Sequence, residues 1–431
     1  MLTPSGLNSL LECARDLAFS LTECTSITDA EDMIQDITRR IAGAMMMQVA
    51  GNMGGRATYG GVRIPCRCGK AADFKGYRSR FIKTLHGDVQ VTRAYYRCRE
   101  CSSSYIPWDR HQGLDERVWT PRVKELVASL CGALTYEAAS KLVEKTTGLV
   151  IEESSEEEIV RDVGRRLRWD EQSAIEAAVD IGEPVVCEEA PERLYIGIDA
   201  AKAHTDGDWH DIKTAVFYAG VRPEGKDTDT VSNSRFVAAQ EKSEEFGRRI
   251  YTKAMQCGYE QARERIVIAD GAEWIWNEVS NHLPGSIKIL DYWHACEHIY
   301  RLASVLYGEG NPNGRRWASE HSRKLKEKGP SGLLRAIKRR KARNEREKEA
   351  LRLELGYFTK YRKQMNYPAY RAKGLMIGSG PVESACKVVV GQRLKQSGMR
   401  WTIDGSDAVL AIRTALLGGE LHRIELAARA A

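Results

Sequence analysis

The chain has 431 residues, of which 42% are hydrophobic and 29% charged, a composition typical of a soluble globular protein with about two to four domains. No run of about 18 apolar residues is present, so we expect no membrane-spanning helix. The N-terminal sequence lacks a basic start and carries Glu12 and Asp16, so we expect no secretion signal and a cytoplasmic, nucleoid-associated location. In such a compartment, eleven cysteines indicate thiols or metal ligands rather than disulfides.

Positive charge is concentrated in one region. Between Arg315 and Lys373 there are 20 Lys and Arg, six Glu and no Asp, a local balance of +14. Because the whole chain carries +6, the remainder carries −8. This distribution indicates a polyanion-binding surface. The alternative is a solvated helix whose charges neutralise one another four residues apart, but "AIKRRKAR" has no acidic neighbour. We therefore expect DNA contacts from its consecutive cations, Lys338, Arg339, Arg340 and Lys341.

The N-terminal part alternates between helical and extended patterns. Apolar residues at helical spacing predict two helices within 7–50, followed by a hinge at 51–55. Residues 59–108 have strand patterns, with a hairpin turn at His86-Gly87-Asp88, and 120–179 are helical again. An acidic stretch with two prolines then predicts a linker. The predicted segments are 1–55 (helical), 56–112 (zinc ribbon), 113–180 (helical) and 181–193 (linker).

The helical segment contains a possible helix-turn-helix at 136–168. One helix is followed by a turn at Gly148 and by a second helix that starts near Ser155. The second helix opens with three glutamates, which phosphates would repel, whereas its other end carries several arginines. The pattern leaves two alternatives open: the pair reads DNA, or it has a structural or dimerisation role.

After the linker, the order of elements predicts a mixed sheet covered by helices. Strand patterns at 193–200, 212–220 and 234–240 are followed by alternating helices and strands, the last near 286–293. This is the element order of an RNase H-like α/β fold. We expect a multidomain α+β protein with the first part of this core at 194–300, a basic α-helical insertion at 301–376, a closing helix at 377–420 and a tail at 421–431.

Four cysteines bracket the predicted hairpin in two close pairs. This arrangement predicts a tetrahedral, structural Zn²⁺ site of the ribbon type. The first pair is one residue closer than usual, although Gly69 can relax its turn, and His86 is a fallback ligand. The alternative is four free buried cysteines. The predicted ligands are Cys66, Cys68, Cys98 and Cys101.

Two carboxylates lie on strands that we expect to be neighbours, one within its strand and the other at the strand's end. Asp199 lies in "LYIGIDA", and Asp270 ends the apolar run of "RIVIAD". Two converging anions are costly unless a cation joins them, and oxygen ligands with room for water favour Mg²⁺. Alternatively, Asp270 caps the following helix. Glu383 is the candidate third ligand, although after Gly380 and Pro381 it also occupies a capping-box position.

Several motifs resemble those of DDE transposases of bacterial insertion sequences, in particular the ISKra-type group. "DYWHACEH" is similar to the D-x-x-H signature of the Mutator and hAT groups, met here by Asp291 and His294. The resemblance extends from about residue 59 to 417 and is most specific near the C-terminus. The other matching motifs are CxCG…YYxCxxC from Cys66 to Cys101, DGAxWIW from Asp270 to Trp276, and GSGxVESACK with RLKxxGMRW between Gly378 and Trp401.

This resemblance implies cleavage of transposon ends and strand transfer into target DNA. Two Mg²⁺ or Mn²⁺ ions would be held by Asp199, Asp270 and Glu383. His294 would contact a phosphate or orient a carboxylate, or it is a structural histidine. Trp401 would stack on an unpaired base, or it packs at a helix end. The cations expected to hold the DNA backbone are Lys387, Arg393, Lys395 and Arg400.

The resemblance also implies double-stranded DNA as the partner and a homodimer or higher oligomer as the active form. Two other functions fit the same residues. One is a non-catalytic, domesticated zinc-ribbon DNA-binding protein. The other is an RNase H-like nuclease that cuts without joining strands.

Overall fold

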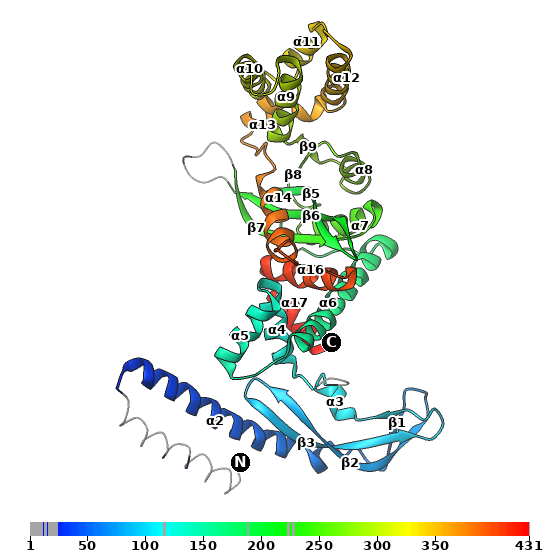
Figure 1. Cartoon of the computed structure of the whole chain (residues 1–431). Coiled ribbons are helices and arrows are strands. Elements are labelled where there is room, and N and C mark those ends of the chain that lie inside the picture. Colours follow the sequence, from blue (N-terminus) through cyan, green and yellow to red (C-terminus); the bar gives the residue numbers. More distant parts are fainter. Residues whose placement is uncertain are drawn as a thin grey trace. The chain divides into compact units, whose positions relative to one another are not determined.

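The computed structural model describes residues 25–114, 118–187, 189–221, 225 and 229–430, together with Glu12 and Arg15. The first of the two helices predicted within 7–50 lies outside these residues. The chain forms two compact units (Figure 1): the first comprises Met1–Leu167 and Leu421–Ala431, and the second comprises Arg168–Glu420. The division falls inside a helix, α6 (Glu153–Ile175).

The first unit begins with a long amphipathic helix, α2 (Ile27–Met53). The Ser26 side chain accepts the backbone N–H of Asp29 and so caps the start of this helix. The helix continues to Met53, so the predicted hinge at 51–55 is wrong over most of its length, and the chain first turns at Gly54. A short 3₁₀ helix, η2 (Gly55–Thr58), follows.

Four antiparallel strands form the sheet of the first unit, in the spatial order β1-β2-β3-β4. In the register of the central pair, Ala72 lies opposite Cys98 at one end and Thr84 opposite Gly87 at the other. The hairpin turn therefore lies at Leu85 and His86, slightly earlier than the predicted His86-Gly87-Asp88, and it is at the far end of the hairpin from Cys98. The strands are β1 (Arg63–Pro65), β2 (Ala71–Thr84), β3 (Gly87–Cys98) and β4 (Ser104–Tyr105).

Helices complete the first unit. Thr135 caps the first helix of the predicted helix-turn-helix pair, and Gly148, with φ of 75°, ends it in the left-handed conformation, so the turn predicted there is confirmed. Glu156, in the acidic start of the next helix, is fully buried. The helices are α3 (Pro107–His111), α4 (Pro121–Ala133), α5 (Tyr136–Thr147), α6 and α17 (Leu421–Ala430); a π-helical stretch, η3 (Glu176–Ile181), follows α6 in the second unit.

The second unit is built on a mixed five-stranded sheet with the order β7-β6-β5-β8-β9. Strand β6 pairs antiparallel with both β7 and β5. Strand β8 pairs parallel with both β5 and β9. The predicted mixed sheet is therefore present. The strands are β5 (Arg193–Thr205), β6 (Asp208–Val221), β7 (Thr230–Ala239), β8 (Glu264–Ala269) and β9 (Ile287–Leu290).

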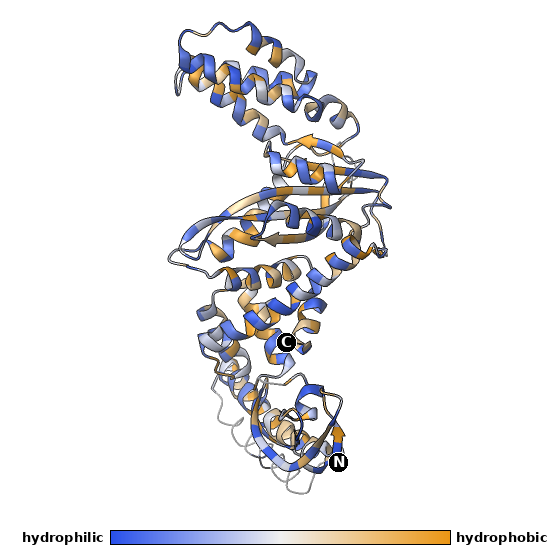
Figure 2. Cartoon of the chain, turned by 90° about the vertical axis from the view of Figure 1, so that its right-hand side faces the viewer, coloured by the Kyte–Doolittle hydropathy of each residue, from blue (hydrophilic) through white to orange (hydrophobic). Residues whose placement is uncertain are grey.

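Helices flank this sheet and extend from its parallel edge. The α-helical block predicted at 301–376 is present, but it begins earlier, directly after β9. Figure 2 shows apolar and polar residues alternating along its helices, as expected for helices with one buried face. The helices are α7 (Ser243–Gln256), α8 (Glu273–His282), α9 (Tyr292–Tyr307), α10 (Pro312–Lys328), α11 (Ser331–Arg339), α12 (Glu345–Lys360), η4 (Arg362–Met365) and α13 (Tyr367–Ala372).

The chain then returns to the sheet through the predicted closing helix. A Cβ placed on Gly197 of β5 would lie 2.8 Å from Cβ of Val382, so the glycine allows this helix to approach the strand beside Asp199. The segments are α14 (Gly380–Ala385), the π-helical η5 (Cys386–Gly391), α15 (Gln392–Leu394) and α16 (Ile403–Leu417). Among the described helices, none is long and apolar enough to cross a membrane.

Candidate active site and metal centre

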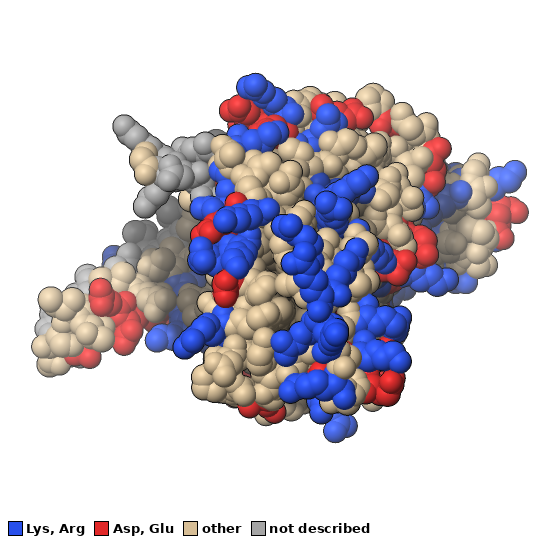
Figure 3. Space-filling view, turned by 90° about the horizontal axis from the view of Figure 1, so that it is seen from above, with Lys and Arg blue, Asp and Glu red and all other residues tan. Residues whose placement is uncertain are grey.

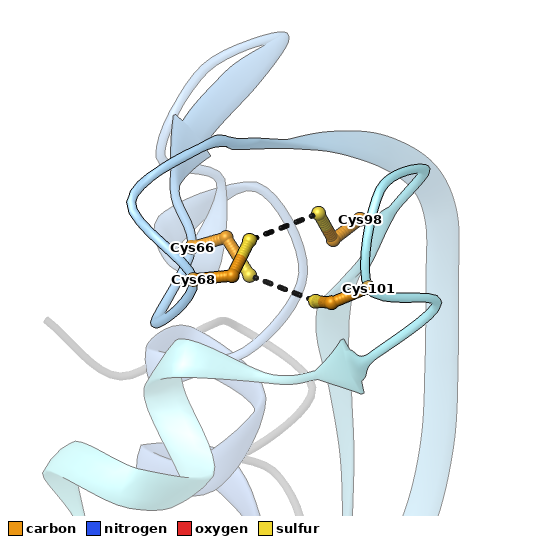
Figure 4. A group of neighbouring side chains, drawn as sticks. All are labelled: Cys66, Cys68, Cys98 and Cys101. Atoms are coloured by element: carbon orange, nitrogen blue, oxygen red, sulfur yellow. Dashed lines mark hydrogen bonds between the residues drawn. The ribbon is translucent and has the colours of Figure 1, made fainter.

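The four predicted cysteine ligands lie together beside the antiparallel sheet of the first unit (Figure 4). The Sγ atoms of Cys66 and Cys101 are 3.6 Å apart, and those of Cys68 and Cys98 are 3.7 Å apart. A tetrahedral ion with Zn–S bonds of about 2.3 Å would separate its sulfur ligands by about 3.8 Å. The four thiols therefore fit a tetrahedral metal ion without rearrangement.

Tight turns bring the two cysteine pairs together. Gly69, with φ of 81°, donates its N–H to the Cys66 carbonyl and closes the first turn. In the second, Cys98 N–H donates to the Ser103 carbonyl, and the side chain and backbone of Ser103 lower the pKa of the Cys101 thiol, whereas burial and the other three thiols raise the pKa of Cys68. A thiolate at neutral pH is the form that binds metal. His86 lies at the other end of the hairpin, so the prediction of a fallback ligand there is wrong.

In the second unit, the sheet register places two of the predicted acids side by side. Ile198 of β5 pairs with Ala269 of β8 in the parallel register, so Asp199 and Asp270 follow at equivalent positions. Burial, together with the charge of Asp270, raises the pKa of the Asp199 carboxyl above its ordinary value. The Ala200 N–H, which donates to Asp199 Oδ1 at 2.7 Å, acts in the opposite direction. The two carboxylates therefore repel each other across the adjacent strands β5 and β8.

Asp270 does not cap helix α8. Its Oδ1 accepts the N–H of Ala272 at 2.8 Å, and Ala272 is itself the N-cap residue, without a side-chain cap bond. The Asp270 carbonyl accepts the indole N–H of Trp276 at 2.8 Å. The carboxylate thus shapes the turn that leaves β8, and the cap alternative does not explain its position.

The next strand contributes a third acid and the predicted histidine. Ala269 of β8 pairs with Leu290 of β9, so Asp291 follows at the same sheet edge. Asp291 caps α9 by accepting the N–H of Trp293 and His294, and it also accepts Ser379 N–H at 3.0 Å. Its oxygens are therefore used to join α9 to the start of the closing helix. His294, in the first turn of α9, is close enough to lower the pKa of Asp199.

Glu383 is on the exposed side of the closing helix. Three residues later, Cys386 lies on the same sheet face as the acids, with its Sγ 3.8 Å from Asp199 Oδ2. Residues three apart on a helix are neighbours, so Glu383 projects from the rim of this site. Among the described residues, the four cysteines are the one group of three or more His, Cys, Asp and Glu whose ligand atoms lie within 4.8 Å of one another.

The site also contains residues that the sequence analysis did not select. His298 Nδ1 and Glu354 Oε2 are 2.7 Å apart, and the ring of Tyr357 stacks on His298. Burial and the charge of Asp270 raise the pKa of Tyr357. A Cβ on Gly271 would lie 2.8 Å from Tyr357 Oη, so the glycine makes room for this ring. The sequence of α12 could not identify Glu354 and Tyr357 as part of the site, because they reach it only through the way in which the inserted helices pack.

The predicted basic surface is exposed on the helical block of the second unit. Figure 3 shows Lys and Arg side chains spread across this face, with fewer acidic side chains between them. All six glutamates of 315–373 are already engaged: five pair with Lys or Arg of the block, and Glu354 pairs with His298. Within the part of the chain that the structure describes, no carboxylate pairs with Lys338, Arg339, Arg340 or Lys341, all of which are exposed.

The cations predicted around the closing helix differ in exposure. Lys387, Lys395 and Arg400 are exposed and available to a ligand. Arg393 is fully buried, with its guanidinium 4.8 Å from the centre of the Trp401 ring. The structure therefore corrects the prediction that Arg393 contacts DNA, since its side chain is enclosed by the fold. One face of Trp401 is covered by Arg393, which agrees with the alternative of ordinary packing.

A family model described as "Uncharacterised protein family (UPF0236)" matches residues 67–429. The chain belongs to the UPF0236 family. Its relatives include the "UPF0236 protein in vanSb 3'region" of Streptococcus gallolyticus, which is 23% identical over 348 residues, or 79% of this chain and 73% of that protein.

Among solved structures, this UPF0236 chain is similar to the Drosophila P element transposase strand transfer complex. The match covers 73% of this chain and 82% of that chain, at 10% identity and a TM-score of 0.25. At that TM-score, the likeness carries no argument about fold or function.

Proposed function

We propose that this UPF0236 chain is a DNA transposase that cleaves transposon ends and joins them to target DNA with the help of a divalent metal. The observation that carries the proposal is the convergence of Asp199, in the middle of β5, and Asp270, directly after the end of β8, on adjacent strands. The strand order β7-β6-β5-β8-β9 also supports the proposal, because it is the order expected of an RNase H-like core. Its first three strands are antiparallel to one another, and β8 and β9 run parallel to β5.

The acids suit a divalent cation. Burial and, to a smaller extent, the charge of Asp270 raise the pKa of Asp199, and a shared positive charge would stabilise both carboxylates. Carboxylate oxygens favour Mg²⁺ or Mn²⁺, and we assign two such ions to Asp199 and Asp270, with Glu383 as the third ligand from the closing helix. When bound, the metal would activate a water or a DNA 3′-hydroxyl and stabilise the leaving oxygen.

The chain's own residues would position the DNA around these acids. His294 would contact a phosphate or orient Asp199, whose pKa its charge lowers, and Asp291 caps the helix that carries it. The exposed cations of the helical block would neutralise backbone phosphates, which fixes the position of the duplex without reading its sequence. We further assign Zn²⁺ to the four cysteines as a structural ion, and a homodimer or higher oligomer as the active form.

The test is an assay with the purified protein, Mg²⁺ or Mn²⁺, and labelled DNA that carries the sequences flanking the coding region. A transposase should release metal-dependent cleavage products and, when given pre-cut ends, join them to a target plasmid. Cleavage without joining would assign a nuclease instead. Binding without cleavage in either metal, by wild-type protein and Asp270→Asn protein alike, would assign a non-catalytic DNA-binding protein.

A further inference from the structure

A cavity of about 470 Å³ opens in the first unit beside the cysteine cluster. Its wall combines several guanidinium groups with one carboxylate and two tyrosines. The charged and aromatic residues that line it are Arg67, Arg78, Arg80, Arg93, Tyr95, Tyr105 and Asp109. The cavity is therefore strongly basic, although no DNA contact was predicted in this part of the chain.

The sheet register forces two of these arginines together. Arg78 on β2 lies directly opposite Arg93 on β3. Like charges directly opposite on one sheet face destabilise the pair unless an anion joins them. The one carboxylate of the cavity is already engaged: Asp109 accepts two bonds from Arg93, both at 2.8 Å, and a third from Arg80 at 3.3 Å.

The remaining positive charge is oriented but not neutralised. The Arg78 guanidinium lies over the Tyr95 ring, 4.5 Å from its centroid, and the Tyr95 hydroxyl donates to Ser104 Oγ at 2.8 Å, which fixes the ring. Arg78 pairs with no carboxylate among the residues that the structure describes. Burial, and after it the charge of Arg93, lower the pKa of Arg80 against the opposing effect of Asp109. A bound anion would relieve this crowding.

We propose that this cavity binds a phosphate group, and that the phosphate belongs to the backbone of a nucleic acid. Planar guanidinium forks match phosphate oxygens bidentately, and Arg78, aligned on Tyr95, presents such a fork at the rim. The ion pairs of Asp109 hold Arg93 and Arg80 rigid behind it. The phosphate site stands on this geometry alone, whereas DNA as its source rests on the proposed function.

The experiment compares Arg78→Ala, Arg78→Lys and Arg63→Ala in the full chain. Arg63 is the matched control, because it is an exposed arginine of the same sheet that pairs with Asp73 at 3.0 Å. Fluorescence anisotropy with a labelled duplex is measured over a range of salt concentrations. We expect Arg78→Ala to weaken binding about tenfold and to lower the slope of log K against log salt by about 1, while Arg63→Ala changes neither. Arg78→Lys should keep the slope and lose part of the affinity.

A second arm uses inorganic phosphate and the melting temperature of DNA-free protein. At matched ionic strength, phosphate should raise the melting temperature of the wild type but not of Arg78→Ala. If phosphate stabilises the wild type but not Arg78→Ala, while Arg78→Ala binds DNA like the wild type, the cavity binds free phosphate and the nucleic-acid assignment is overturned. If Arg78→Ala and Arg63→Ala agree in both arms, the whole inference is overturned.

The readout is independent of catalysis, so the two proposals fail separately. If the protein never cleaves DNA but Arg78→Ala weakens DNA binding as expected, the phosphate site is supported and the proposed function is not. Protein that cleaves while Arg78→Ala behaves like the wild type retains the proposed function alone.

Discussion

The rings of His298 and Tyr357 lie face to face, with centroids 3.8 Å apart and planes 10° from parallel. His298 belongs to α9, which begins at the acids, and Tyr357 belongs to α12 of the helical block. Glu354, one turn before Tyr357, fixes the other edge of the stack through His298 Nδ1. The inserted block is thereby tied to the site, and Tyr357 Oη is buried beside Gly271 with no hydrogen-bond partner among the described residues.

The unpaired hydroxyl of Tyr357 leads to the first prediction. A buried donor without a partner is costly, so we expect it to bond to a substrate phosphate during the reaction. Tyr357→Phe should then lower the rate of DNA cleavage about tenfold to a hundredfold, while melting temperature and DNA affinity stay unchanged. Tyr361→Phe is the control, because its hydroxyl donates to the Gly271 carbonyl at 2.7 Å and its loss should cost about 1 kcal/mol of stability. Wild-type cleavage by Tyr357→Phe would reduce Tyr357 to a packing role.

The strands of the second unit could be predicted because a buried strand is recognisable from the apolar pattern of its own residues. The apolar run of β8 and the alternation in β5 and β6 predicted a mixed sheet, with Asp199 on one strand and Asp270 at the end of its neighbour. The lengths of β5 and β6 were underestimated, because their outer halves are polar. The missed signal was Asp206-Gly207, whose φ values of 48° and 88° make the tight hairpin turn that these residues favour.

The candidate site was less predictable than the fold. The order of the strands follows from the topology, so the pairing of Asp199 with Asp270 on neighbouring strands could be predicted. Tyr357 reaches the site only through the tertiary course of about sixty inserted residues, which no local pattern specifies. The burial of Arg393 could not be predicted from the sequence either, since a cation at a helix end is ordinarily exposed.

The basic block gives the second prediction. Changing Lys338, Arg339, Arg340 and Lys341 to Ala should flatten the slope of log K against log salt by about two to four units, because each neutralised phosphate contributes roughly 0.9. The matched control removes four cations that have glutamate partners: Arg323, Lys324, Lys348 and Arg352. That control should change the slope much less. Equal effects of the two sets would mean that overall charge, and not this surface, governs binding.

The cysteine cluster gives the third prediction. We expect one zinc per chain by elemental analysis, and we expect Cys98→Ser to lose it, because one ligand of a closed tetrahedral site is removed. The small sheet of the first unit should then unfold at a lower temperature. Cys187→Ser, at a half-buried cysteine outside the cluster, should keep full zinc occupancy. Stoichiometric zinc in Cys98→Ser would contradict the assignment.

Glu156 gives a prediction about pH. Its carboxyl is fully buried without a hydrogen-bond partner among the described residues, and burial, with the charge of Glu153, raises its pKa from 4.5 to about 7. Because the folded state holds this proton more tightly than the unfolded state, the free energy of unfolding should fall as pH rises from about 4.5 through about 7. Denaturant unfolding at several pH values measures this slope.

Glu156→Gln should remove that part of the slope and make the first unit more stable than the wild type at pH values above the raised pKa. The control is Glu152→Gln, since Glu152 is exposed just before the same helix. A wild-type slope in Glu156→Gln would mean that other groups cause the dependence.

The last prediction concerns Asp270. Asparagine can still accept the Ala272 N–H, so Asp270→Asn should keep the turn after β8. It removes the charge that raises the pKa of Asp199, so the melting temperature should stay equal or rise. If Asp270 is a metal ligand, cleavage in Mg²⁺ or Mn²⁺ should nevertheless fall by orders of magnitude, with DNA affinity unchanged. Asp199→Asn and Glu383→Gln should behave alike.

Combining these substitutions should cost little more than one of them, because residues that serve one site are not additive. The control is Glu273→Gln: Glu273 follows closely on the chain but pairs with Lys360 at 3.3 Å, and its loss should leave cleavage intact. If Glu383→Gln cleaves normally while the two aspartate variants do not, the third ligand is elsewhere. Glu297, whose carboxylate lies 3.5 Å from His294, is then the next residue to change. Normal cleavage by Asp270→Asn would mean that Asp270 only stabilises the turn after β8, and it would contradict the proposal that Asp270 binds a metal ion.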